Sequence, residues 1–144
     1  MSVGSGQEIL LVDDDERVRT VLHALLKKKG YRVRLASDNS SALMNVVFNG
    51  PTLALVVLDM KMPGLDGERT LQGIRALHAD LPCLVYSAFC DQAAMERMQL
   101  GGYFDFLAKP STMKELLAKI ASMLEKYPRG NPPEPAVIDA APAT

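Results

Sequence analysis

Several residue types are scarce in this sequence, and each scarcity argues against a class of protein. The 144 residues contain no tryptophan, two histidines and only two cysteines, Cys83 and Cys90. The cysteines fit no metal-site spacing, so we expect both to be free thiols of a cytoplasmic protein. Apolar runs such as residues 53–58 are too short to cross a bilayer. The net charge of −1 offers no basic excess for nucleic acid or an anionic membrane.

The two ends of the chain differ in composition from its middle. Residues 1–7 are rich in Gly and Ser without the basic start or apolar stretch of a signal peptide, so we expect a flexible leader. From residue 128 onward Pro and Ala dominate, which favours a disordered tail or linker at residues 128–144. The predicted folded unit is one domain over residues 8–127.

Short apolar runs alternate five times with segments of helical periodicity in this unit. The runs predict strands at residues 9–12, 31–35, 53–58, 83–86 and 103–107. The periodic segments predict helices around residues 18–26, 40–49, 68–79, 91–100 and 112–124. Thr112 and Glu115 form the pattern of a capping box at the start of the last helix. Such alternation predicts an α/β fold with a parallel sheet covered by helices on both faces.

Polar residues stand at or just beyond the ends of four predicted strands. Asp13 and Asp14 follow the first strand and Asp59 follows the third. Ser87 follows the fourth strand, and Lys109 comes shortly after the fifth. Because open α/β sheets bind ligands beyond the carboxyl ends of their strands, we expect these five side chains to form one site.

These side chains together suit the chemistry of phosphoryl transfer. Three carboxylates in one crevice repel each other unless a cation joins them, and Mg²⁺ prefers such oxygen ligands. Lys109 and the hydroxyl of Ser87 would neutralise and hydrogen-bond the oxygens of a phosphoryl group. A carboxylate can act as the nucleophile and form an acyl phosphate. Asp59 is the natural candidate because its central strand holds it between the acid pair and the lysine.

With these motifs in order, the sequence resembles the CheY-like receiver domains of response regulators from residue 9 to about residue 124. Residues 13–14 match the acidic pair of the family, and residues 58–67 match its phosphoacceptor motif. Ser87-Ala88 matches its hydroxyl-alanine pair, and Lys109-Pro110 matches its lysine-proline pair. Phe106 stands at the position of the family's switch aromatic. Each motif alone is weak, but five in order at family spacing are specific.

The resemblance implies a flavodoxin-like, doubly wound (βα)5 fold with strand order 2-1-3-4-5. It implies that Asp59 is the phosphoacceptor. It implies Mg²⁺ as cofactor, bound by Asp13, Asp14, Asp59 and the backbone carbonyl of Lys61. It also implies a cis peptide bond before Pro110.

The resemblance further implies a signalling role in a two-component phosphorelay. The donor would be a phosphohistidine on a sensor histidine kinase or a phosphotransfer protein. The domain would assist its own phosphorylation and dephosphorylation without being an enzyme for a separate substrate. Ser87 and Phe106 would act as switch residues that change the surface of helix four, strand five and helix five. We expect that surface to bind a downstream protein target, with a phosphorylation-dependent homodimer left open and no membrane or direct nucleic-acid partner.

Two rim positions, Lys61 and Phe89, lie two residues after Asp59 and Ser87. In the family that this sequence resembles, these positions influence how water reaches the acyl phosphate. We predict that Phe89 hinders the attacking water and lengthens the phosphorylated lifetime. A Phe89→Ala variant that loses phosphate no faster than wild type would count against this.

Two other classes of protein remain as alternatives. A haloacid-dehalogenase-type phosphatase would need a hydroxyl or Val two residues after Asp15, where Arg17 stands. A degenerate receiver could bind partners independently of phosphorylation, although all five site residues are present. No output-domain motif follows residue 127, so we expect a single-domain regulator or a receiver excised from a larger protein such as a hybrid kinase.

Overall fold

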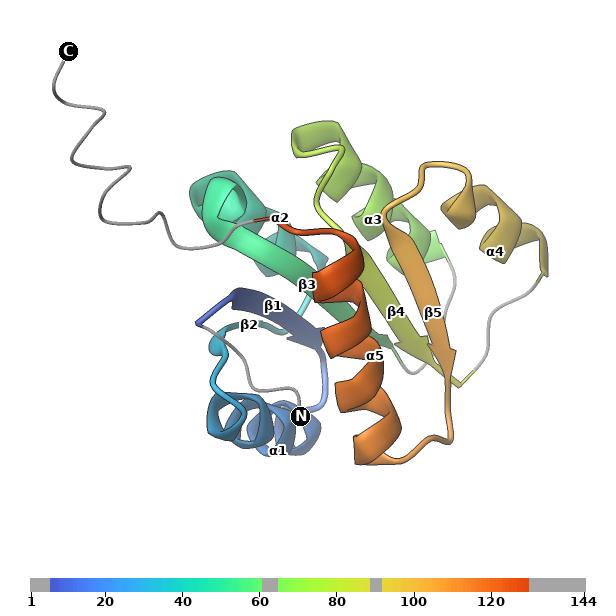
Figure 1. Cartoon of the computed structure of the whole chain (residues 1–144). Helices are drawn as coiled ribbons and strands as arrows, with labels where there is room; N and C mark the ends of the chain where they lie inside the picture. The colour runs from blue at the N-terminus through green and yellow to red at the C-terminus, as the bar shows by residue number, and fades with distance from the viewer. Residues whose placement is uncertain (1–5, 61–64, 89–91, 130–144) are drawn as a thin grey trace, which may run out of the picture.

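A computed structural model describes residues 6–60, 65–88 and 92–129, and the fold is given for those residues. Five strands form one parallel sheet in the order β2-β1-β3-β4-β5 (Figure 1). The strands are β1 (Glu8–Asp13), β2 (Arg32–Ala36), β3 (Leu53–Met60), β4 (Cys83–Ser87) and β5 (Phe104–Ala108). The predicted α/β fold and the implied strand order are both confirmed.

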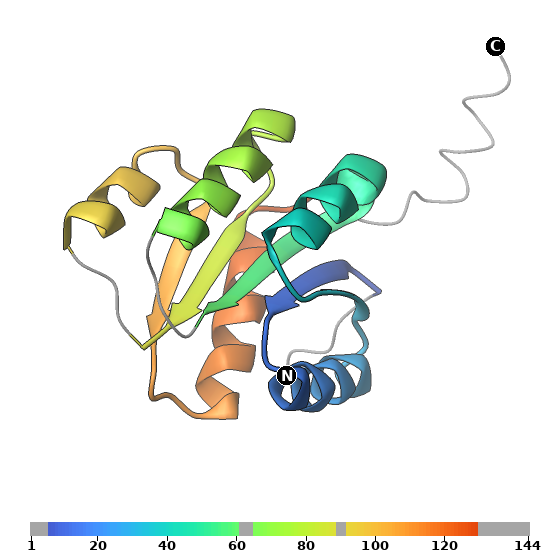
Figure 2. The same cartoon turned by 180° about the vertical axis from the view of Figure 1, so that it is seen from behind.

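The helices cover both faces of this sheet, as Figures 1 and 2 show. They are α1 (Glu16–Lys28), α2 (Asn39–Asn49), α3 (Leu65–Leu77), α4 (Gln92–Gln99) and α5 (Met113–Lys126), with a short 3-10 turn η1 (Gly50–Thr52). Helices α1 and α5 lie on one face, and α2, α3 and α4 lie on the other. None of the helices in the described ranges has the length and apolar character that crossing a membrane requires.

Alternate residues of the central strands build two separate cores. Leu10 and Val56 pack with side chains of α2, α3 and α4. Ile9 and Leu55 point the other way and pack with side chains of α1 and α5. All side chains of residues 53–59 are buried, which explains why this stretch reads as a continuous apolar run up to Asp59.

Local capping sets the ends of the first helix. The Asp15 side chain accepts a hydrogen bond from the backbone N–H of Arg17 at 2.9 Å and caps the N-terminus of α1. At the other end Gly30 has φ of 98° and donates its N–H to the Lys27 carbonyl at 3.0 Å. This left-handed turn is the one that glycine makes without strain, and it carries the chain into β2.

The predicted capping box at the start of α5 is confirmed. The N–H of Glu115 donates to Thr112 Oγ1 at 3.0 Å, and the N–H of Thr112 donates to Glu115 Oε1 at 2.7 Å. These two bonds satisfy helix donors that would otherwise lack an intrahelical partner, so they fix where the chain turns after β5.

Some predicted bounds were wrong. Helix α3 begins at Leu65 and ends at Leu77, not at residues 68 and 79. After the helix, the Leu81 N–H donates to the His78 carbonyl at 3.1 Å in a turn that leads to β4. Leu77 and Val21 recur at helical spacing with the packed apolar residues of their helices, but they are 44% and 57% exposed. The apolar residues at helical spacing cover a wider part of the helix surface than the part that contacts the sheet, so some of them stay exposed. Asp91, the first residue of the predicted fourth helix, lies outside the described residues.

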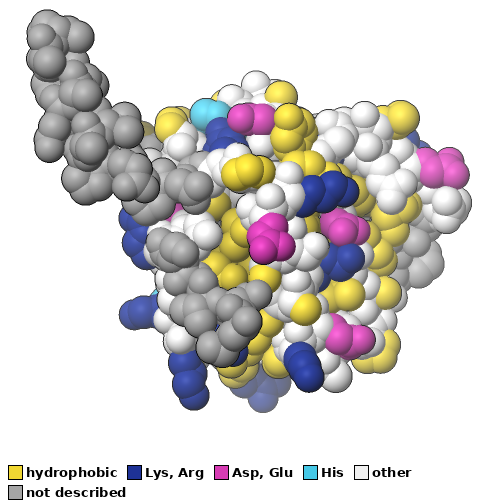
Figure 3. All heavy atoms as spheres, viewed as in Figure 1, with side chains coloured by type: hydrophobic (Ala, Val, Ile, Leu, Met, Phe, Trp, Pro, Cys, Tyr) yellow, Lys and Arg dark blue, Asp and Glu magenta, His cyan; other side chains and the backbone are white. Residues whose placement is uncertain are grey.

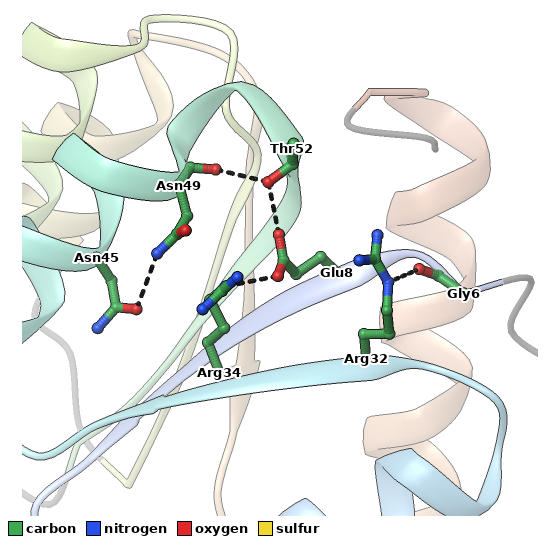
Figure 4. Close-up of polar contacts among 7 residues, drawn as sticks. All are labelled: Gly6, Glu8, Arg32, Arg34, Asn45, Asn49 and Thr52. Atoms are coloured by element: carbon green, nitrogen blue, oxygen red, sulfur yellow. Dashed lines mark hydrogen bonds and ion pairs between the residues drawn. The ribbon is translucent and has the colours of Figure 1, made fainter. Parts of the chain in front are cut away.

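A buried acid connects several segments at the amino-terminal end of β1 (Figure 4). This end of the sheet is opposite the one that carries Asp13 and Asp59. Glu8 opens β1 and is only 3% exposed. Its carboxylate accepts hydrogen bonds from Arg34 Nε at 2.5 Å and from Thr52 Oγ1 at 2.7 Å. Thr52 Oγ1 also lies 3.0 Å from the Asn49 carbonyl oxygen. Glu8 therefore joins β1, β2 and the turn that leads from α2 into β3.

Candidate functional site

The carboxyl ends of the strands bring four of the five predicted site residues to one edge of the sheet. Asp13 ends β1 and is the register partner of Asp59 on β3. Ser87 ends β4, and Lys109 follows β5 directly and donates its backbone N–H to the Ser87 carbonyl at 2.8 Å. The parallel pairing of β1, β3, β4 and β5 thus places acids, hydroxyl and amine side by side.

Asp59 is the best-enclosed acid at this edge. Its residue exposure is 2%, and Lys109 Nζ donates a hydrogen bond to its Oδ1. The other oxygen, Asp59 Oδ2, is buried and has no hydrogen-bond partner among the described residues. A buried carboxylate oxygen without a donor is costly, so this side chain is only half satisfied by the protein.

Asp13 is similarly enclosed, with 3% exposure. Its Oδ1 accepts a hydrogen bond from the backbone N–H of Asp15 at 2.9 Å, while its buried Oδ2 has no partner in the described part of the chain. Burial raises the pKa of Asp13 to about 7, with the adjacent Asp59 carboxyl adding to the increase. The Asp15 N–H and the Lys109 charge oppose it. The acid pair therefore resists carrying two negative charges unless a further cation joins it.

The two unpartnered oxygens, Asp13 Oδ2 and Asp59 Oδ2, are a suitable donor set for a small divalent cation. Magnesium typically uses one or two carboxylates and keeps several waters, so these residues fit it. Asp14, the third predicted ligand, is exposed. Within the described ranges no group of three or more His, Cys, Asp or Glu side chains is arranged to hold a metal. Lys61, whose carbonyl was implied as a ligand, lies outside those ranges.

The candidate switch residues differ in burial. Ser87 is fully buried at 0% exposure. Phe106 is partly buried and packs against the core on the side of α2, α3 and α4. Their movement on phosphorylation stays a prediction. Phe89, predicted to hinder water, lies outside the described residues, as does Cys90; Cys83 is buried and free.

Lys109 has a second contact that the sequence did not predict. Its Nζ lies 4.8 Å from the centre of the Tyr86 ring, a distance typical of a cation–π interaction. Tyr86 is 5% exposed, and its hydroxyl oxygen accepts a hydrogen bond from Ser111 Oγ at 3.3 Å. The peptide bond between Lys109 and Pro110 is cis. In the sequence, the only indication of this contact is that an aromatic residue precedes Ser87, and that position is equally typical of a buried strand residue.

The fold and this edge define the class of protein: an α/β domain with an acid pair and a lysine at the carboxyl ends of a parallel sheet. Comparison with known families gives the same class. The family described as "Response regulator receiver domain" matches residues 9–121. The chain belongs to this family, which excludes the haloacid-dehalogenase alternative.

Similar proteins include response regulators and a sensor kinase. The response regulator MprA of Mycobacterium sp. (strain KMS) is 38% identical over 130 residues, which cover 90% of this chain and 56% of that protein. The sensor kinase CckA of Brucella abortus is 32% identical over 118 residues, which cover 82% of this chain and 12% of the kinase. The chain therefore spans only about half the length of the regulators, and less of the kinase.

Solved structures share the fold. The CheX-CheY-BeF3-Mg²⁺ complex from Borrelia burgdorferi contains a chain that matches with a TM-score of 0.72 and 23% identity, over 81% of this chain and 88% of that one. At this identity the likeness shows the fold alone. Members of the family serve as signalling phosphoacceptors in two-component systems and interact with histidine kinases.

Proposed function

We propose that this receiver domain accepts a phosphoryl group on Asp59 from a phosphohistidine of a sensor histidine kinase or a phosphotransfer protein. A carboxylate oxygen of Asp59 attacks phosphorus, the P–N bond of the donor breaks, and the imidazole leaves with the electron pair. The product is an acyl phosphate on the domain. The observation that carries the proposal is the buried Asp59 carboxylate. Lys109 donates to one of its oxygens, and the other has no hydrogen-bond partner in the described part of the chain.

Lys109 and Asp13 have separate roles in this proposal. Lys109 already contacts Asp59, so its ammonium group can neutralise a phosphoryl oxygen with little rearrangement. Asp13 and Asp59 would hold Mg²⁺ through their unpartnered oxygens, with Asp14 joining as the third acid. The cation, when bound, neutralises charge on the transferring phosphoryl group. The side chain of Ser87 would donate a hydrogen bond to another phosphoryl oxygen.

The output would be a shift in the surface formed by α4, β5 and α5. Ser87 is buried at the end of β4, and Ala108 at the end of β5 is its register partner. Phe106 lies two residues earlier on β5 and is only partly buried. A phosphoryl group that binds Ser87 in one arrangement would favour that arrangement and move Phe106 with it. A downstream protein, or a second phosphorylated copy, would bind the altered surface.

Phosphorylation by a small-molecule donor tests the proposal without a partner. The full chain is incubated with acetyl phosphate, with and without Mg²⁺, and its intact mass is measured. We expect an added phosphoryl mass that requires Mg²⁺ and disappears in Asp59→Asn. The matched control is Asp105→Asn, because Asp105 is a partly exposed acid on β5 that pairs with Lys119 at 3.0 Å, away from the acid pair.

The result decides between the proposal and the remaining alternative. No adduct on folded wild-type protein with Mg²⁺ present would favour a phosphorylation-independent binding module. An adduct that persists in Asp59→Asn would place the phosphoacceptor elsewhere. A cytoplasmic location, the kinase and the downstream target stay predictions in either case.

A further inference from the structure

Helix α2 presents an unusual surface for a small domain. Met44, Val47 and Phe48 are 53%, 52% and 72% exposed. Their spacing of three and four residues places them on one side of the helix, and we call these three side chains the α2 face. Large apolar side chains gathered on one exposed helix face commonly mark a contact surface.

The whole of α2 lacks charge, which separates it from the other surface helices. It contains no Asp, Glu, Lys or Arg, although it lies on the outside of the sheet. Helix α5, by contrast, carries both signs of charge, and Figure 3 shows dark blue and magenta side chains close together over it. A helix that water alone covers normally has such a polar outer face. The composition of α2 therefore favours an apolar occupant.

Arg129 brings the C-terminal part of the chain to this helix. Its side chain is only 12% exposed, and Nη1 donates hydrogen bonds to the carbonyls of Gly50 and Leu53, both at 2.7 Å. Nη2 lies 3.1 Å from His78 Nδ1, and Nε lies 3.1 Å from Asp80 Oδ1. Four groups from two stretches of the chain, residues 50–53 and 78–80, surround this guanidinium. Because Gly50 directly follows α2, the chain beyond Arg129 begins beside the C-terminal end of that helix.

We propose that the α2 face binds the apolar run Ala136-Val137-Ile138 of the chain's own C-terminal segment. This run is the only stretch beyond Arg129 that contains large aliphatic side chains. Seven residues of chain span up to about 24 Å when extended, and an 11-residue helix is about 16 Å long, so the run can reach every part of the α2 face.

Two further properties favour the chain's own segment as the occupant. The run is flanked by Glu134 and Asp139, and α2 has no acidic side chain to repel them. Tethering at Arg129 also makes the contact intramolecular, so a weak apolar interface suffices at a high effective concentration. The segment would then lie on the side of the sheet covered by α2. It would leave the surface of α4, β5 and α5 free for a partner.

A single tryptophan reports on this contact in the full chain. The protein has no tryptophan, and Phe48 is largely exposed, so Phe48→Trp places one indole on the α2 face without disturbing the core. In that background we expect Val137→Asp with Ile138→Asp to shift the emission to longer wavelength and to increase quenching by acrylamide. The matched control, Ala140→Asp with Ala141→Asp, adds the same charge beyond the run and should change neither.

The anchor and the oligomeric state complete the test. Arg129→Gln should shift the emission in the same direction, because it frees the segment from the end of α2. Equal emission and quenching in the Val137/Ile138 variant and the control would overturn the proposal. Sedimentation equilibrium distinguishes the other occupant. A second copy of the chain would be the occupant if three results were found together: a dimeric wild type, a monomeric Phe48→Ser variant and a dimeric Val137/Ile138 variant. That outcome would overturn the proposal.

Discussion

Asp13 makes the stability of the domain depend on pH. Burial raises its pKa to about 7, so the folded state binds the proton more tightly than the unfolded chain does. The stabilisation is therefore complete below the unfolded pKa, near 4, and is lost as the pH rises through about 7. Without metal, we expect the free energy of unfolding in urea to decrease over this interval by on the order of 4 kcal/mol, since each pKa unit corresponds to about 1.4 kcal/mol.

Two comparisons identify the group responsible. Asp13→Asn removes the titrating carboxyl and should flatten the pH dependence, whereas Asp105→Asn should leave it unchanged. Saturating Mg²⁺ should also flatten it, because a bound cation lowers the pKa of its carboxylate ligands. An Asp13→Asn protein with the same pH dependence as wild type would assign the effect to another group.

Tyr86 should affect how well Lys109 is positioned. Removing the ring in Tyr86→Leu takes away a cation–π contact of about 0.5–1 kcal/mol, so we expect phosphorylation by acetyl phosphate to slow by roughly two- to fivefold. Tyr86→Phe keeps the ring and loses only the contact with Ser111, so its rate should stay near that of wild type. Equal slowing in both variants would assign the effect to the hydroxyl group instead.

Among the elements, β2 is attached to β1 through more than backbone pairing. Arg34 is the cation that compensates the buried Glu8, so Arg34→Met leaves that carboxylate without its charge partner. We expect a loss of about 1–3 kcal/mol in the free energy of unfolding, measured in urea. Arg32→Met is the matched control on the same strand, because Arg32 Nε donates to the backbone carbonyl of Gly6, at 2.7 Å, instead of to a buried carboxylate. Equal losses would mean that Glu8 does not need its partner.

The elements themselves were largely predictable because their signals are local. The apolar run at residues 53–58 and the capping box at Thr112 each depend on neighbours within a few positions, and the structure confirms both. The acids at the strand ends were also predictable, since parallel strands must end together. Contacts between residues far apart in sequence left no such pattern. Lys109 over Tyr86 and Arg129 against His78 could be found only from the folded chain.

Across the whole molecule, the site joins parts of unequal stability. Asp13 and Asp59 end β1 and β3, which lie inside the sheet, and each pairs with a strand on both sides. Lys109 follows β5, an edge strand that pairs only with β4 and is less buried. Buried central strands open mainly by global unfolding, and edge strands open locally at lower free energy. The acid pair is therefore the fixed half of the site, and Lys109 with Phe106 belongs to the half that can move.

This difference between the two halves of the site predicts which strand phosphorylation stabilises. Strand β2 is the opposite edge of the sheet and has no residue in the site, so it serves as an internal control for β5. With acetyl phosphate and Mg²⁺ maintaining the phosphorylated state, we expect hydrogen exchange of β5 amides to slow by an order of magnitude or more, because a phosphoryl group bound to Lys109 restrains that edge. Exchange in β2 should change little. Equal slowing in both edge strands would instead indicate a general gain in stability, with no selective restraint of the edge that carries Lys109 and Phe106.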